Sequence, residues 1–185
     1  SPTPTSAVAQ CAPALLETCE DPGKALVALQ GNATDPAKQK LSWQWGKGSA
    51  VLADFGDPVG GTTNYRVCFY DDGVLRRSFA IAAGETCDKK PCWSSGKSGL
   101  KYRSKAGNAD GVTQLTLHPA LGKATIALQG KGAGLALPFP IADATAVTVQ
   151  LVKDPGSGAE CWGVRFPAPP KTSKPAKLKF ADKTP

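Results

Sequence analysis

Few side chains in this sequence have the types and spacing that catalysis needs. Ser94 and Lys97 have the spacing of a serine acyl-transfer nucleophile and its lysine, but they lie in the loop sequence WSSGKSG rather than on a helix. Asp54 and Asp57 could supply the two carboxyl groups of a glycoside hydrolase, yet neighbours in a turn rarely face each other across a cleft. We therefore predict no catalytic residue and keep a small secreted hydrolase as a second alternative.

Metal and cofactor sites are equally unsupported by the residue types. The chain has a single His, His118, and a His-rich zinc site needs two or more imidazoles. In VTQLTLHP this His falls on the polar side of an alternating run, which favours an exposed position at the end of a strand over a catalytic one. The sequence predicts no metal and no cofactor.

The six cysteines predict three disulfides, because an even number with short spacings is typical of proteins that fold in an oxidising compartment. Period-two alternation in 65–70 and 161–166 points Cys68 and Cys161 away from the core. Two such residues can bridge if their antiparallel strands are neighbours. We predict these pairs: Cys68 with Cys161, Cys87 with Cys92, and Cys11 with Cys19.

The tryptophans allow two interpretations. Leu41, Trp43 and Trp45 share one face of a strand, and Trp93 follows Cys92 in an irregular loop. A row of indoles on a flat sheet is a platform on which sugars can stack, but such a stripe more often faces the core. We expect the stripe to be buried and Trp93 to be the most exposed of the three indoles.

These side chains must be positioned by strands and turns, since 20 Gly and 16 Pro leave little room for long helices. Apolar or alternating runs are separated by Gly, Asp, Asn and Pro, and Asp71-Asp72-Gly73 predicts a hairpin turn, with a longer turn over 154–158. The number of runs predicts an all-β antiparallel sandwich of ten to twelve strands. We expect strands at 24–30, 40–46, 50–55, 63–70, 74–82, 99–103, 112–118, 123–129, 133–137, 146–153, 160–166 and 176–180.

Both ends of the chain differ from the middle. Residues 1–23 form a predicted N-terminal arm with the Cys11–Cys19 loop, 24–166 form the sandwich domain, and 167–185 form a Pro- and Lys-rich arm. In the second arm Leu178 and Phe180 fall on one face of an extended segment. That segment could add as a strand to a sheet edge of its own sandwich or of another copy.

The charge balance is basic, with 22 Lys plus Arg against 15 Asp plus Glu and a net charge of +7. Arg is the minority among these cations, and aromatics are not interleaved with them, so we expect no nucleic-acid partner. The charge favours a solvated surface, and extracellular polysaccharide is the preferred polyanion if there is one. No apolar run is long enough for a transmembrane helix. The absence of Met favours a processed chain whose signal peptide has been removed.

Six motifs lie along about residues 24–183: WxWxKG at 43–48, FGDP at 55–58, YxxCxYD at 65–71, CxxxxCW at 87–93, the glycine-spaced segment 131–138, and CW at 161–162. Together they resemble a group of uncharacterised secreted bacterial β-domains with disulfides. The resemblance implies an exported bacterial protein in which Cys68, Cys87, Cys92 and Cys161 are the shared framework and the two N-terminal cysteines are additions. It brings no activity with it, and 135–138 departs slightly from the group's pattern.

From these observations we expect a noncatalytic extracellular structural or interaction module that assembles through its terminal arms, as a fibre or surface-layer subunit would. A carbohydrate-binding module using Trp93, Trp43 and Trp45 is the first alternative. Leu178 and Phe180 are the interface candidates in the arm.

Overall fold

Runs that alternate apolar and polar residues form the strands of this protein. The computed structural model describes residues 10–32, 34–141, 145–154 and 161–182. The strands are β1 Lys24–Gln30, β2 Lys40–Ala50, β3 Asn64–Asp71, β4 Val74–Ile81, β5 Thr86–Cys87, β6 Lys90–Pro91, β7 Trp93–Gly96, β8 Gly99–Arg103, β9 Val112–His118, β10 Ala120–Lys131, β11 Val147–Asp154, β12 Cys161–Phe166, β13 Thr172–Lys174 and β14 Lys177–Asp182. Three short 3₁₀ helices join them: η1 Pro36–Lys38, η2 Leu52–Phe55 and η3 Ala133–Leu135.

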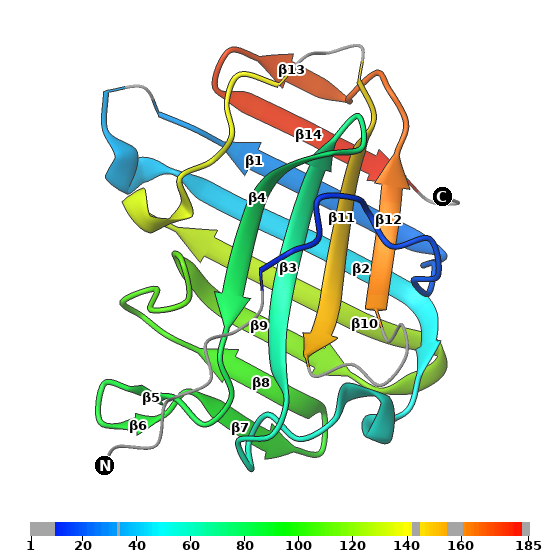
Figure 1. Cartoon of the computed structure of the whole chain (residues 1–185), viewed down its shortest axis with the longest axis vertical. Coiled ribbons are helices and arrows are strands. Elements are labelled where there is room, and N and C mark those ends of the chain that lie inside the picture. Colours follow the sequence, from blue (N-terminus) through cyan, green and yellow to red (C-terminus); the bar gives the residue numbers. More distant parts are fainter. Residues whose placement is uncertain (1–9, 33, 142–144, 155–160, 183–185) are drawn as a thin grey trace.

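Two antiparallel sheets face each other, so the predicted all-β sandwich is confirmed. The larger sheet has the strand order β13-β14-β1-β2-β10-β9-β8-β7 and the smaller has the order β12-β11-β3-β4, while β5 and β6 form a separate hairpin. In Figure 1 the four-stranded sheet crosses in front of the eight-stranded sheet. No helix within the described segments is long and apolar enough to cross a membrane.

The core lies between the inner faces of the sheets. In β2 the buried positions Leu41, Trp43 and Trp45 alternate with polar ones, as the sequence predicts. Gly48 makes room for this stripe, because a Cβ at that position would collide with the Trp45 ring. The opposing sheet contributes Val67 and its neighbours on β11 and β12 to the same cluster. Burial of this apolar face is what holds the two sheets together.

Two predicted strands are wrong because local backbone chemistry ends them. After Ala50 the chain forms η2, where the N-cap Val51 N–H donates to Asp54 Oδ2 at 2.7 Å and Gly56 adopts a φ of 68°. The predicted strand 133–137 is replaced by η3 at Ala133–Leu135, which follows Gly132 with a φ of 95° and precedes Ala136 with a φ of 42°. The predicted Asp71-Asp72-Gly73 hairpin turn is present between β3 and β4. Most of the predicted 154–158 turn lies outside the described residues.

The N-terminal segment covers the outer face of the four-stranded sheet as a partial third layer (Figure 1). A small apolar cluster there includes Cys11, Cys68, Tyr70 and Cys161, with Leu16 packed against it. The Tyr70 hydroxyl donates to the Ala12 carbonyl at 2.9 Å. The outer face of this sheet is therefore buried by residues that the sequence places in an arm.

This layer explains why two of the predicted disulfides are wrong. The bonds are Cys11–Cys68, Cys19–Cys161 and Cys87–Cys92, so only the last predicted pair is confirmed. Cys68 and Cys161 do face outward, but β11 lies between β3 and β12. Two strand spacings amount to about 9.6 Å, beyond the Cα–Cα range of about 4.4–6.8 Å that a disulfide spans. Instead, Cys68 forms a disulfide with Cys11 and Cys161 forms one with Cys19, both in the N-terminal segment that covers these strands.

The C-terminal segment belongs to the eight-stranded sheet. β14 pairs with β1 in antiparallel register, with Leu178 opposite Leu29 and Phe180 opposite Val27. Leu178 and Phe180 are buried, and the Phe180 ring lies 5.7 Å from that of Phe166 between ring centroids. Of the two expectations for this segment, addition to its own sandwich is the one observed.

Candidate functional site

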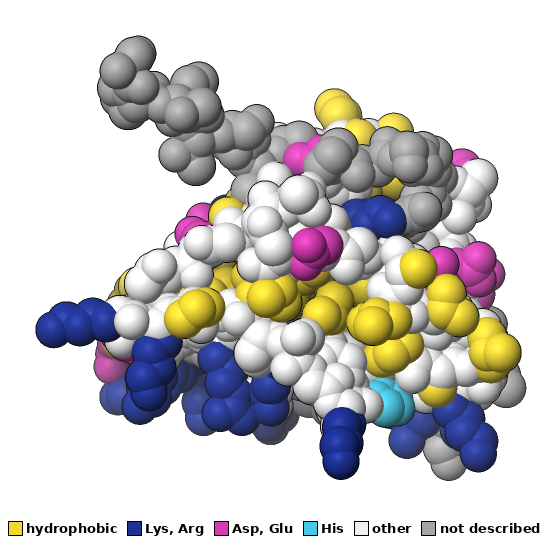
Figure 2. Space-filling model, turned by 90° about the horizontal axis from the view of Figure 1, so that it is seen from below, with side chains coloured by type: hydrophobic (Ala, Val, Ile, Leu, Met, Phe, Trp, Pro, Cys, Tyr) yellow, Lys and Arg dark blue, Asp and Glu magenta, His cyan; other side chains and the backbone are white. Residues whose placement is uncertain are grey.

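The outer face of the eight-stranded sheet concentrates positive charge. Basic side chains crowd the lower surface in Figure 2, whereas most Asp and Glu side chains of that view lie higher. Within the described strands of this sheet, the one acidic residue is Asp182, at the last position of β14. The basic residues of these strands are Lys24, Lys40, Lys47, Lys101, Arg103, Lys123, Lys131, Lys174, Lys177 and Lys179.

The strand register arranges four of these lysines in one row. Residues that pair directly across strands point to the same face of a sheet. Lys174 pairs with Lys177, Lys177 with Gln30, Gln30 with Lys40, and Lys40 with Lys131. The row therefore contains two directly opposed lysine pairs. Among the described residues no acidic side chain lies within ion-pair distance of these lysines. We call this set the lysine row.

A second row of outward side chains runs beside the lysine row, and it is mostly neutral. Its small members form a low floor, and its amides and hydroxyls can both donate and accept hydrogen bonds. From β13 to β8 the paired residues are Thr172, Lys179, Ala28, Ser42, Gln129, Gln114 and Arg103. We call this set the amide row.

Two hollows follow these rows across the strands. The first, of about 790 Å³, lies over β7–β10 and against the Cys87–Cys92 hairpin. The second, of about 400 Å³, lies over β14, β1, β2 and β10. Thr113, Gln129 and Lys131 line both, so the hollows join at the end of β10. Together they form one trough that crosses the sheet.

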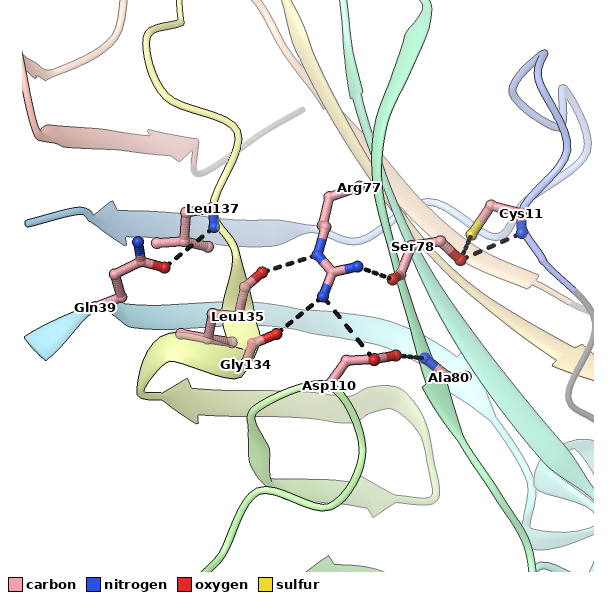
Figure 3. Close-up of polar contacts among 9 residues, drawn as sticks. All are labelled: Cys11, Gln39, Arg77, Ser78, Ala80, Asp110, Gly134, Leu135 and Leu137. Carbon is pink, nitrogen blue, oxygen red and sulfur yellow. Dashed lines mark hydrogen bonds and ion pairs between the residues drawn. The ribbon is translucent and has the colours of Figure 1, made fainter. Parts of the chain in front are cut away.

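Contacts from the other sheet hold the junction of the trough from behind (Figure 3). Arg77 on β4 donates from Nε to the Leu135 carbonyl at 2.8 Å and from Nη2 to the Gly134 carbonyl at 2.9 Å. These carbonyls belong to η3, just after Lys131. Asp110 accepts from the Ala80 N–H at 2.8 Å and lies 4.0 Å from Arg77 Nη2. The end of β10 is thus fixed between two sheets.

The start of β2 is tied to the same place. The Gln39 carbonyl accepts from the Gly132 N–H at 3.0 Å. Figure 3 shows the second contact, in which Gln39 Oε1 accepts from the Leu137 N–H at 3.2 Å. Gln39 and Gly132 directly adjoin the opposed Lys40 and Lys131. The two lysines therefore project from backbone that is held on both sides.

The predicted sugar-stacking platform does not form. Trp43 and Trp45 are buried, and the expected exposure of Trp93 is wrong. Trp93 begins strand β7, faces inward and packs between Tyr65 and Tyr102, with ring centroids 5.5 and 5.4 Å away. Its Nε1 donates to the Ala82 carbonyl at 2.9 Å. Pairing with β8 thus orders a segment that the sequence presents as a loop.

The aromatic cluster beneath β7 perturbs its tyrosines. Burial raises the pKa of Tyr102 to about 12, and the nearby Glu85 carboxylate contributes to this increase. Burial also raises the pKa of Tyr65, whose hydroxyl donates to the Phe55 carbonyl. These phenols are structural donors of the core rather than groups that open onto the trough.

The acidic residues considered for catalysis make turn contacts. Asp54 accepts from the Val51 N–H, and Asp57 Oδ1 accepts from the Gly60 N–H at 2.7 Å. Across the described segments, no three His, Cys, Asp or Glu side chains gather as metal ligands would.

The site could not be predicted from the sequence, because the register of the strands was unknown. The tail lysines fall in a predicted arm, and Lys40 and Lys131 fall on separate segments with no local signal that would place them opposite each other. One signal was available, since 24–30, 40–46 and 112–131 contain several Lys and no acidic residue.

Comparisons with protein-family models, with curated proteins and with solved structures found no match for this chain. The resemblance to secreted bacterial β-domains stays a prediction.

Proposed function

We propose that this protein is a noncatalytic extracellular interaction module that binds an anionic polymer on the outer face of its eight-stranded sheet. The observation that carries the proposal is the lysine row. Like charges directly opposite each other destabilise a sheet, and this row contains two such pairs with no acidic neighbour in ion-pair contact among the described residues. A bound polyanion would relieve the repulsion between these lysines by neutralising them, and the release of counterions would favour its binding.

An extracellular setting is supported by the three disulfides, which persist in oxidising compartments. The resemblance to secreted bacterial domains points the same way. Assembly through the arms stays a prediction, although residues 172–182 and much of 10–22 already contact their own chain. A face that binds an extended polymer needs no exchange of arms to act as an interaction module.

A charge reversal tests the proposal through two readouts. The Lys131→Glu substitution should lower the affinity for heparin or polygalacturonate about tenfold or more, because a charge-assisted contact is worth about 1.5–3 kcal/mol. The same change should raise the free energy of unfolding by about 0.2–1 kcal/mol, since the new carboxylate would lie opposite Lys40. Calorimetric titration and denaturant unfolding measure the two quantities.

The matched control is Arg165→Glu, an equal charge change at an exposed position on the other sheet. We expect it to leave the affinity nearly unchanged. Equal loss of binding in both variants would mean that only net charge matters, and no binding of either polymer by the native protein would reject the proposal.

A further inference from the structure

The trough runs across the strands of the sheet, and its length restricts which polymers fit it. The lining runs from Lys177 on β14, through Lys40 and Lys131, to Arg103 on β8. These residues lie across five strand spacings, which amount to about 24 Å at about 4.8 Å per strand. A ligand that follows the trough therefore crosses the strands as an extended chain several units long.

The lining alternates charge with neutral hydrogen-bonding groups. Cations stand at both ends and at the junction of the hollows, where Lys40 and Lys131 are directly opposed and can hold one anion together. Gln30, Gln129 and Gln114 lie between them. Amides of this kind donate to and accept from hydroxyl groups. Among the described residues that line the two hollows, the one acidic side chain is that of Asp88, beside the disulfide hairpin.

The burial of the Trp side chains disfavours two ligand classes, neutral sugars and nucleic acids, that bind by stacking on aromatic rings. All four Trp are at most 2% exposed, so neither neutral sugar rings nor nucleic-acid bases find an indole to stack on at this face. Among the described cations lining the trough, Arg103 is the single Arg, so most anion contacts there would be made by lysine ammonium groups. A polymer that presents carboxylates at intervals and hydroxyls between them matches what the trough offers.

We propose, on the basis of the function proposed above, that the trough binds a polysaccharide containing uronic acids, lying across strands β14 to β8. The lysine row holds its carboxylates and the amide row binds its hydroxyls. Chain length and the neutral amides then matter to affinity as well as charge.

The test uses the full-length protein with galacturonic acid and a series of oligogalacturonates. Affinity should rise with chain length until the oligomer spans about 24 Å and then level off, because no further contacts are available. The Gln129→Leu substitution should lower the affinity for polygalacturonate about fivefold, as expected for loss of one neutral hydrogen bond. The salt dependence of binding should not change in this variant, since no charge is removed.

Gln44→Leu is the matched control, because Gln44 is exposed on the neighbouring strand β2 but lines neither hollow. It should bind polygalacturonate as the native protein does. A second variant, Ser42→Phe, fills the floor of the second hollow without altering charge and should also weaken binding to the longer oligomers.

The outcomes separate this inference from the broader function. If dextran sulfate, which contains no uronic acid, or duplex DNA binds as tightly as polygalacturonate, or if Gln129→Leu has no effect while Lys131→Glu does, the face binds polyanions without selecting uronates and the inference is wrong. If no polyanion binds at low salt, the proposed function fails as well.

Discussion

Two buried or half-buried side chains give this fold contacts that a neighbouring strand would otherwise supply. Gln150 on β11 accepts from the Leu16 N–H at 3.1 Å and donates to the Leu16 carbonyl at 2.6 Å, as a paired strand residue would. Arg77 donates to two carbonyls of η3. Unpaired backbone groups are costly to bury, so each side chain lets an irregular segment pack against a sheet. The first secures the N-terminal layer and the second secures the trough.

At the same scale, the buried tyrosines should set the pH above which the folded state loses stability. Burial raises the pKa of Tyr65, Tyr70 and Tyr102, and these are the three tyrosines of the chain. Above pH 10 the unfolded chain ionises its phenols while the folded chain keeps them neutral. The folded state then binds more protons, so the free energy of unfolding falls as pH rises from about 10 towards 12.

Absorbance of the phenolate measures this directly. The native protein should show almost no phenolate at pH 10, whereas the protein in denaturant should be about half ionised there. A native titration curve that overlays the denatured one would contradict the buried positions of these rings.

At the scale of elements, the disulfides differ in how much of the chain they constrain. Cys19–Cys161 joins residues 142 positions apart, whereas Cys87–Cys92 joins residues 5 apart. Replacing Cys19 and Cys161 together by Ala should lower the free energy of unfolding by about 5 kcal/mol, and the same change at Cys87 and Cys92 by about 2 kcal/mol, from loop-closure entropy. Denaturant unfolding of both double variants measures the difference.

Peptide mapping without reduction checks the connectivity itself. We expect peptides that join Cys11 to Cys68 and Cys19 to Cys161. A peptide joining Cys68 to Cys161 would instead require these strands to be neighbours, and it would overturn the sheet order of the structure.

The elements also show how much of the fold a sequence can predict. Alternation is a local property, so it predicted β2, β9 and the inward direction of Trp43 and Trp45. It also placed Cys68 on an outward face. Which strands are neighbours is a non-local property, and the same alternation cannot reveal it. The partners of Cys68 and Cys161 depend on neighbours, and for that reason they were predicted wrongly. The opposition of two lysines across β2 and β10 depends on neighbours too, and it was not predicted.

At the scale of the whole molecule, the two outer faces of the sandwich differ in what covers them. The outer face of the four-stranded sheet is partly covered by the chain's own N-terminal segment, through two disulfides and the Gln150 contacts. The outer face of the eight-stranded sheet keeps its lysine row uncovered by any described segment, and Figure 2 shows the resulting separation of charge. The basic face is therefore the one that this module leaves open to solvent.

Removal of the C-terminal strand tests whether copies of this protein assemble by exchanging it. If copies assembled by exchanging this strand, removal of residues 172–185 would abolish association. In the structure β14 pairs with β1 of its own chain and buries Leu178 and Phe180. Removal should therefore expose the β1 edge and an apolar strip, so that the truncated protein is less stable and associates more than the intact protein, because an unpaired edge strand favours pairing with another chain.

Light scattering and thermal unfolding of the intact and truncated chains at matched concentrations test this expectation. Two substitutions separate the edge from the apolar strip. Phe180→Ala removes buried contacts and should lower the free energy of unfolding by about 3–5 kcal/mol while β14 stays paired. Lys179→Ala, at the exposed neighbouring position, should change it by less than about 0.5 kcal/mol. An intact protein that associates and a truncated one that is monomeric and equally stable would favour exchange of the arm between copies over pairing within the chain.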